Sequence, residues 1–276
     1  MKIGIGSFLT GRSIRPDVLG KALEERGFEC LLVPEHSHIP VCRESPYPGG
    51  GELPPYYARM LNPFVALTAA ATVTSRLTLG TGIALMVQRD VIYTAKEVAS
   101  LDVLSGGRVM FGAGPGWNRE QMRNHGTDPR TRGALLDEQL AALKQIWTHD
   151  EAEFHGKFID FDPIWSWPKP VREPHPPIYV GGWGPAAVTR VSRYGDGWLA
   201  GPAPDPAGVV PQLEMLNDYA PGSPMTVFGA DGTDLAVLDA YRDADIERVA
   251  LLLEPASEVD TLTQLDAWAP LVERYA

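Results

Sequence analysis

Apolar and polar positions along this chain form a regular order of short apolar runs and longer amphipathic stretches. Two runs, LLV at 31–33 and VALLL at 249–253, are continuous, as expected of strands buried on both faces of a parallel sheet. The predicted strands are 2–7, 30–34, 77–83, 109–112, 178–181, 197–200, 225–228 and 248–253. The predicted helices are 16–26, 63–74, 91–104, 130–148, 185–194, 206–218, 235–244 and 258–275. Eight strand–helix units predict an α/β fold, a single (β/α)8 TIM barrel domain over residues 1–276, with an open two-layer sheet as the alternative.

Two long segments, residues 35–62 and 150–177, interrupt this order. The first is rich in Pro and Gly and contains Tyr56 and Tyr57, and the second contains Trp165. Both are longer than ordinary connections, and such loops often cover binding sites. The first follows the second strand and therefore belongs to the C-terminal face, where barrel enzymes carry out their chemistry. The second precedes the fifth strand, yet an insertion of this length can fold over the mouth of the barrel.

Composition narrows the possible partners. The chain of 276 residues has a formal net charge of −11, which argues against a nucleic-acid partner because phosphate backbones require clustered Lys and Arg. Its two cysteines, Cys30 and Cys42, provide neither a disulfide framework nor a C-x-x-C site. The N-terminal MKIGIGSF enters a strand without an apolar signal core, and no run approaches a membrane span. We therefore expect a cytoplasmic protein that binds neither nucleic acid nor membrane.

Residues 109–120, VMFGAGPGWNRE, combine an apolar strand with closely spaced glycines, an aromatic and an amide. Glycines let the backbone approach a ligand, Trp117 offers a face for stacking, and Asn118 can cap the next helix while donating to a ligand. The dinucleotide fingerprint G-x-G-x-x-G fails, because after Gly112 and Gly114 its third glycine position holds Trp117. The loop thus predicts a binding site and weakens a Rossmann interpretation.

A carboxylate and two imidazoles, Glu35, His36 and His38, follow the predicted strand 30–34. His36 is the candidate catalytic residue, since an imidazole there can donate a hydrogen bond to a ring carbonyl or nitrogen, or move a proton near neutral pH, with Glu35 orienting it. The alternative is a turn with a capped histidine. We expect no metal, because the remaining histidines are scattered and metal sites normally need three or four ligands.

Two further strand ends are rich in glycine. The sequence LGTGIA, which includes Thr81, Gly82 and Ile83, suits a bulge where a flat ligand approaches the backbone, or an ordinary tight turn. The sequence GGWGP, which begins at Gly181, suits phosphate binding at a helix start, or merely a turn from strand to helix. Hydrolase, NTPase and zinc-protease motifs are absent, so the pattern favours an enzyme whose cofactor supplies the chemistry.

Three stretches carry a resemblance to a known family. LLVPEHSHIP, LGTGIALMVQRDVIYTAKEVASLDVLSGGRVMFGAGPGWNREQMRNHG and WPKPVREPHPPIYVGG resemble the luciferase-like oxidoreductases over about the first two hundred residues. The pattern is most similar to the branch that uses the deazaflavin coenzyme F420. The resemblance implies a (β/α)8 barrel with the cofactor at its C-terminal mouth, a homodimer, and a non-proline cis peptide bond around Thr81, Gly82 and Ile83.

The resemblance also implies roles for residues of this chain. His36 would lie beside the reactive carbon of the cofactor ring, and Gly181 and Gly182 would hold the phosphate-bearing tail. The cofactor contacts implied in this way are Ser7, His36, Thr81, Gly82, Ile83, Gly114, Trp117, Asn118, Gly181, Gly182 and Trp183. Pro115 stands where certain sugar-phosphate dehydrogenase relatives have a glutamate, which argues against their proton donor and their substrate here.

Together these features predict an F420-dependent oxidoreductase that moves a hydride between deazaflavin C5 and a small organic substrate under the loops bearing Tyr56, Tyr57 and Trp165. One alternative is an FMN-dependent luciferase-like monooxygenase. Another is a flavin- or deazaflavin-binding protein without turnover, since fold does not fix function.

Four arginines follow the glycine-rich loop 109–120. They are Arg119, Arg123, Arg130 and Arg132. This cluster is a candidate site for the polyglutamate tail of F420. The alternative is a solvated helix face, because exposed arginines are common.

Overall fold

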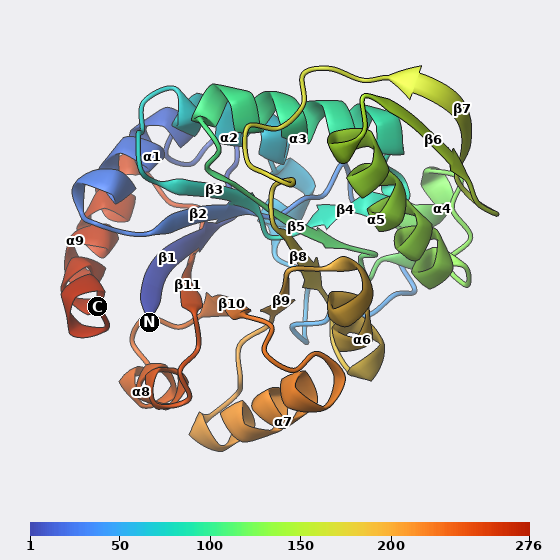
Figure 1. The fold of residues 1–276 in the computed structure, drawn as a ribbon. Helices are drawn as coiled ribbons and strands as arrows, with labels where there is room; N and C mark the ends of the chain where they lie inside the picture. Colours follow the sequence, from blue (N-terminus) through green and yellow to red (C-terminus); the bar gives the residue numbers. More distant parts are fainter.

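A closed ring of parallel strands forms the centre of the molecule, which the computed structural model describes over residues 1–276. The ring consists of β1 (Lys2–Ser7), β2 (Cys30–Val33), β3 (Thr78–Thr81), β5 (Val109–Gly114), β8 (Ile178–Gly181), β9 (Gly197–Ala200), β10 (Met225–Ala230) and β11 (Arg248–Leu253). Neighbouring strands pair in parallel, and the pairing of β3 with β5 closes the ring (Figure 1). The predicted closed (β/α)8 barrel is confirmed, and the open sheet is excluded.

Helices surround the ring on its outer side (Figure 1). They are α1 (Pro16–Glu25), α2 (Pro63–Ala71), α3 (Val91–Ser105), α5 (Arg132–Thr148), α6 (Pro185–Tyr194), α7 (Val209–Tyr219), α8 (Leu235–Asp243) and α9 (Glu258–Arg274). Local sequence sets their ends. Asp90 caps α3 by accepting a hydrogen bond from the Tyr93 N–H at 2.8 Å, and Gly106 ends α3 with a φ of 69° that favours glycine. None of the helices combines the length and apolar composition that a membrane span needs.

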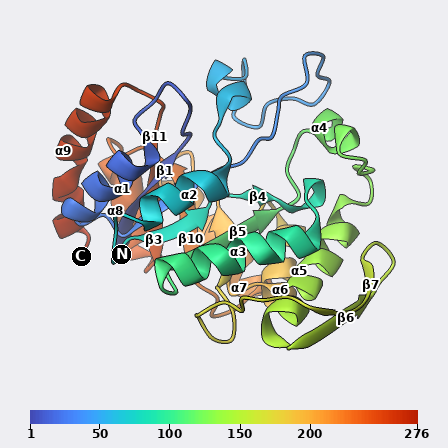
Figure 2. The same cartoon turned by 90° about the horizontal axis from the view of Figure 1, so that it is seen from above.

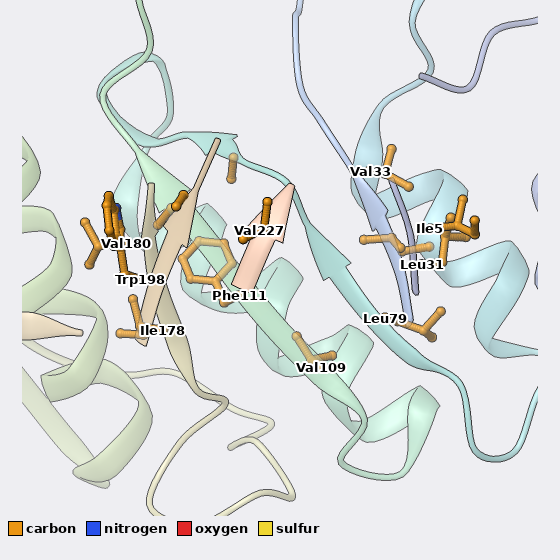
Figure 3. Packing of buried hydrophobic residues seen from close by; sticks show 14 of the residues in the cluster. Ile5, Leu31, Val33, Leu79, Val109, Phe111, Ile178, Val180, Trp198 and Val227 are labelled. Atoms are coloured by element: carbon orange, nitrogen blue, oxygen red, sulfur yellow. The ribbon is translucent and has the colours of Figure 1, made fainter. Parts of the chain in front are cut away.

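The hydrophobic core has two layers, because successive side chains of a strand point to opposite faces. Side chains such as Ile5, Leu31 and Phe111 belong to a cluster of 60 buried residues between the strands and the helices (Figure 3). The cluster inside the ring is smaller and consists of Cys30, Leu32, Met110, Tyr179, Leu199 and Ala250. The interior is narrow enough that a Cβ at Gly112 would lie 1.9 Å from the Thr81 carbonyl oxygen. A glycine therefore allows β3 and β5 to close the ring.

A buried arginine and a half-buried one, Arg248 and Arg108, occupy the floor of the barrel, the end formed by the N-terminal ends of the strands. Arg248 donates to both carboxylate oxygens of Glu29, at 2.5 and 2.9 Å, and to Thr226 Oγ1 at 3.0 Å. Glu247 lies 3.3 Å from the same guanidinium. Arg108 donates to four backbone carbonyls of the segments before β3 and β5. These two arginines connect segments at the floor that are far apart in the sequence.

Some elements differ from the sequence prediction. The predicted strand 77–83 ends at Thr81, the Gly82–Ile83 peptide bond is cis as the resemblance implied, and the chain continues as β4 (Ala84–Leu85) and the 3-10 helix η2 (Met86–Gln88). The predicted helix 206–218 divides into η3 (Pro206–Gly208) and α7. The short helix α4 (Arg119–Asn124) is too brief, at six residues, to produce a helical period in the sequence.

The two insertions lie at opposite ends of the barrel. Residues 34–62, which include η1 (Pro55–Arg59), extend above the C-terminal ends of the strands near α4 (Figure 2). The second insertion contains the antiparallel hairpin of β6 (Glu151–His155) and β7 (Asp160–Trp165), which packs against α5 below the barrel. It then runs past Asp102, near the end of α3, whose carboxylate accepts the Val171 N–H at 2.7 Å. The second insertion does not fold over the mouth.

Candidate active site

A cavity of about 1670 Å³ opens at the mouth of the barrel, the end formed by the C-terminal ends of the strands. Segments after successive strands contribute to its wall, among them Phe8, His36, Ile83, Trp117, Gly182, Gly201 and Phe228. This volume exceeds the roughly 300–1,000 Å³ typical of pockets for drug-sized ligands. The cavity therefore has room for a large cofactor and a small substrate.

His36 lies in this wall with one ring nitrogen held by the protein. Its Nδ1 lies 2.8 Å from Oε1 of Gln121, a fully buried residue of α4. Its Nε2 makes no hydrogen bond to the protein. Burial lowers the pKa of His36 to about 4, with a further lowering by His38 and an opposing effect of Gln121. The imidazole is thus uncharged near neutral pH.

Glu35 does not orient His36, contrary to the sequence expectation. Its carboxylate accepts the Leu85 N–H at 2.8 Å and pairs with Arg89, which also pairs with Glu97. Burial raises the pKa of Glu35, and the contacts with Arg89 and Leu85 act in the opposite direction. Glu35 joins the segments after β2 and β4. The hydrogen bond that orients His36 comes instead from Gln121, 85 residues away in the sequence.

Aromatic rings surround the exposed side of the His36 imidazole. The ring centres of Tyr57 and Trp117 lie 5.3 and 5.8 Å from the centre of the His36 ring. Tyr47, which sequence reasoning did not single out as a site residue, lies 3.2 Å from Tyr57 between their hydroxyl oxygens. Tyr56 stacks on Tyr57, with 5.3 Å between the ring centres, but does not line the cavity. The part of the cavity next to His36 is therefore mostly uncharged and aromatic.

A second part of the cavity combines glycines with a helix start. Gly182 and Gly184 have φ values of 135° and 77°, and no side chain caps α6, which begins directly after them. Arg190 of α6 lines the same part of the cavity and donates to Asp137 at 2.5 Å. Of the residues in this first turn, Pro185 has no N–H and the Ala187 N–H donates to the Gly184 carbonyl at 3.0 Å, so the Ala186 N–H is left free. A free N–H at a helix start beside a guanidinium suits a phosphate group.

Arginines line the cavity beyond this helix start. They are Arg119, Arg123, Arg130 and Arg132, with the carboxylates of Glu120 and Asp128 nearby. Arg123 lies 3.8 Å from Glu120, and Arg130 pairs with Asp128 at 2.7 Å. Arg119 and Arg132 form no ion pair. The cavity lining thus holds five arginines beside four carboxylates, in a chain whose net charge is −11.

Comparison with known proteins identifies the family. The model of the luciferase-like monooxygenase family matches residues 18–220. The chain belongs to this family. An uncharacterized protein of Mycobacterium tuberculosis is 43% identical over 206 residues, which cover 73% of each chain.

Named luciferase-like relatives differ in cofactor. The FMNH(2)-dependent dimethylsulfone monooxygenase of Pseudomonas putida is 32% identical over 172 residues, which cover 60% of this chain and 45% of the relative. The F420-dependent hydroxymycolic acid dehydrogenase of Mycobacterium tuberculosis is 28% identical over 206 residues, which cover 71% of this chain and 52% of the relative. Membership of this family makes the chain a flavin- or deazaflavin-dependent oxidoreductase.

Two solved structures share the luciferase-like fold over the full length of both chains. Monooxygenase RslO1 from Streptomyces bottropensis superposes with a TM-score of 0.80 at 21% identity. An F420-dependent secondary alcohol dehydrogenase, in complex with an F420–acetone adduct, superposes with a TM-score of 0.75 at 19% identity. At these identities the likeness is one of fold.

The structure brings most of the predicted site residues to one luciferase-like cavity. Those that line it are Glu35, His36, Tyr57, Gly82, Ile83, Trp117, Gly181, Gly182 and Trp183. The others are not part of its lining: Ser7, Tyr56, Thr81, Gly114 and Asn118. Asn118 caps α4 by accepting the Gln121 N–H at 2.8 Å, as the sequence suggested, and Thr81 donates through Oγ1 to the Gly112 carbonyl at 2.6 Å. Their contacts with a cofactor stay predictions.

The placement of Trp165 at the substrate was wrong. Trp165 lies on β7, with 80% of the residue exposed, and its Nε1 donates to Glu151 on the paired strand at 3.1 Å. The hairpin precedes β8 and therefore meets the helix-to-strand side of the barrel. No group of three His, Cys, Asp or Glu side chains is arranged to hold a metal ion.

Proposed function

We propose that this luciferase-like protein is an F420-dependent oxidoreductase that transfers a hydride between deazaflavin C5 and a small organic substrate. The observation that carries the choice of F420 is the group of arginines 119, 123, 130 and 132 in the cavity lining, of which Arg119 and Arg132 form no ion pair. FMN ends at its phosphate, whereas F420 continues into a polyglutamate tail. Arginines with unpaired donors at a cavity suit an anionic ligand such as this tail.

The residues present fit a flat, phosphorylated cofactor. Gly114 and Gly181 lie on either side of Ile83, and a Cβ at these positions would lie 2.3 and 2.6 Å from atoms of the Ile83 side chain. The glycines therefore allow the Ile83 side chain to settle against the strand ends, where it forms one wall of the cavity. Gly182, the α6 start and Arg190 would hold the phosphate. The arginines 119, 123, 130 and 132 would contact the tail.

F420 supplies two-electron hydride chemistry when bound, so the protein has to provide position and a partner for the proton. His36 is the proton partner, because it is the titratable side chain in the cavity wall that the protein leaves with a free ring nitrogen. The surrounding Tyr47, Tyr57 and Trp117 rings exclude water and favour an apolar substrate with one oxygen facing His36.

A parallel binding titration with F420 and with FMN, followed by cofactor fluorescence, tests this proposal. We expect tight binding of F420 and weak binding of FMN. Preference for FMN, with peroxide formed after its reduction, would contradict the proposal and support an FMN-dependent monooxygenase. Binding to neither cofactor would contradict both.

Replacing His36 with Ala separates an enzyme from a cofactor carrier. We expect turnover to fall by about 10²- to 10⁴-fold, the usual contribution of a positioned acid or base, while F420 affinity is retained. His149→Ala, at an exposed position after α5, is the matched control. Unchanged turnover in the His36 variant would contradict its assignment as the proton partner.

A further inference from the structure

Gln121 is a buried polar residue whose side chain reaches the candidate catalytic histidine. It has no exposed surface, and its backbone N–H donates to Asn118 Oδ1 at 2.8 Å in the first turn of α4. Its amide Oε1 lies 2.8 Å from His36 Nδ1, and its Nε2 lies 3.4 Å from Ser37 Oγ. The amide is thus fixed between His36 and the next residue in the chain.

The contacts around Ser37 continue this arrangement to the surface. Ser37 Oγ lies 2.9 Å from His38 Nδ1 and 2.8 Å from His125 Nε2, and Asn124 Nδ2 lies 2.9 Å from His38 Nε2. In one order every donor meets an acceptor: Asn124 donates to His38, His38 donates to Ser37, and Ser37 donates to His125. The second lone pair of Ser37 then accepts from Gln121 Nε2, which turns the amide oxygen of Gln121 toward His36.

An amide oxygen can only accept a hydrogen bond, so the proton on His36 resides on Nδ1 and its Nε2 carries a free lone pair. We propose that Gln121 is a positioning residue that holds His36 uncharged in the Nδ1–H tautomer, so that Nε2 accepts a proton from a substrate hydroxyl. The inference rests on the proposed function for the role of His36 in the reaction.

The tautomer favours oxidation of an alcohol. His36 Nε2 would take the hydroxyl proton while the O–H electron pair becomes the second bond of the carbonyl, and bound F420 would supply the acceptor for the hydride released from the same carbon. In the reverse direction His36 first has to acquire a proton from solvent. An alcohol in an apolar frame is therefore the substrate with which to test this assignment.

No carboxylate contacts the His36 ring. The carboxylate of the adjacent Glu35 is bound by Arg89 and by the Leu85 N–H. Tyr57 and Trp117 face the His36 ring as neutral aromatics. His38 lowers the pKa of His36 and so disfavours a charge on its ring. A neutral amide at position 121 therefore leaves a charged imidazole without an anionic partner. A carboxylate there would supply one.

Gln121→Glu tests this assignment in the ligand-free protein. The full chain contains six histidines, and ¹⁵N-histidine NMR, with His36→Asn for assignment, reports both the tautomer and the pKa of His36. In the unaltered protein we expect Nδ1 to be protonated and Nε2 bare near neutral pH. In Gln121→Glu we expect the pKa of His36 to rise by about two units, because an opposite charge in contact favours the charged ring.

Gln145→Glu is the matched control, since it makes the same substitution at an exposed position of α5, outside the hydrogen bonds around His36. We expect it to leave the pKa of His36 within about half a unit of its original value. A proton on Nε2 in the unaltered protein would overturn the proposal even if Gln121→Glu failed to fold. Equal rises in both variants would also overturn it, because the effect would then be that of charge alone.

The pH dependence of alcohol oxidation links the contact to the reaction. In Gln121→Glu we expect the acidic limb of kcat to move to higher pH by the shift measured for His36, with KM changed less than threefold. A shifted His36 pKa with an unmoved limb would overturn the proposal. Failure of the proposed function can be told apart from failure of this inference. The first appears as absent F420 binding, whereas the NMR result is obtained in the ligand-free protein and does not depend on the cofactor.

Discussion

The arginines at the floor and those at the mouth of the barrel occupy opposite surroundings. The Arg248 side chain at the floor is 5% exposed, with Glu29, Glu247 and Thr226 around its guanidinium. At the mouth the Arg130 side chain is 90% exposed and pairs only with the adjacent Asp128. The floor arginine is fully engaged by the protein, whereas mouth arginines keep donors available.

Arginine therefore has two uses in this barrel: it cross-links strands at the floor and offers hydrogen-bond donors at the mouth. A buried guanidinium needs partners for its charge, and it then cross-links strands far apart in the sequence. A solvated guanidinium contributes little to stability through a surface ion pair. Its remaining donors can instead bind a carboxylate or phosphate of a ligand. Substitution should therefore change stability at the floor and binding at the mouth.

Arg248→Met should have the largest effect on stability. The variant leaves Glu29 and Glu247 without their buried partner, so we expect a loss of about 3–5 kcal/mol in the free energy of unfolding. Urea denaturation measures it. Arg15→Met, which removes an exposed pair with Asp17, is the control and should leave the free energy of unfolding nearly unchanged. Similar losses in the two variants would remove the distinction between a buried and an exposed arginine.

Arg190→Met should affect binding more than stability. We expect cofactor affinity to fall by about 10- to 100-fold, because a hydrogen bond to a charged phosphate contributes roughly 1.5–3 kcal/mol. Arg193→Met, on the same helix but outside the cavity, should leave affinity unchanged. The phosphate is common to F420 and FMN, so both titrations should weaken together. If Arg193→Met weakened binding equally, α6 would not present a specific phosphate site.

The barrel itself could be predicted from sequence because its strands are buried on both faces. Runs such as 31–33 and 249–253 have to be apolar wherever they pack between the helices and the ring interior, so the pattern survives in the sequence. The hairpin β6–β7 lacks this signal, since Glu151, Asp160 and Trp165 are exposed. An exposed strand pair satisfies its own backbone and needs no apolar face.

The candidate site could be predicted in part. Glycines and aromatics at strand ends carry their signal in the sequence, because both are required where backbone and rings meet a ligand. Hydrogen bonds between distant segments leave no signal in the sequence. From the sequence alone Gln121 is an ordinary polar helix residue, and only the fold shows its contact with His36. Glu35 was misassigned for the same reason, since its partner Arg89 lies 54 residues away.

Glu24, on the floor side of the barrel, makes the free energy of unfolding depend on pH. Hydrogen bonds from the N–H groups of Ser75, Arg76 and Leu77 outweigh the effect of burial and lower the pKa of Glu24 from 4.5 to about 2. The folded-state pKa is below the unfolded one, so the stabilisation is present above about pH 4.5 and is lost as the pH falls toward 2. After allowance for partial exposure, we expect about 1–2 kcal/mol.

Denaturation at pH 7 and pH 3 measures the effect of Glu24. In Glu24→Gln the pH dependence should shrink by this amount, whereas Glu25→Gln, at the exposed neighbouring position, should retain it. The site lies at the floor, so F420 affinity near neutral pH should be the same in both variants. Weakened F420 binding in Glu24→Gln alone would show that floor and mouth are coupled.

Arg119 and Arg132 offer the finest test of the mouth, because neither forms an ion pair whose loss would expose a carboxylate. Replacing both with Ala should weaken F420 binding by about threefold to tenfold and reduce its salt dependence, as expected of exposed charges. FMN, which lacks the tail, should bind as before. Replacing Arg12 and Arg15 with Ala, both exposed and outside the cavity, controls for the same change in net charge. Equal affinities for F420 in the double variant and the unaltered protein would show that Arg119 and Arg132 belong to a solvated helix face. The choice between F420 and FMN would then depend on the two titrations alone.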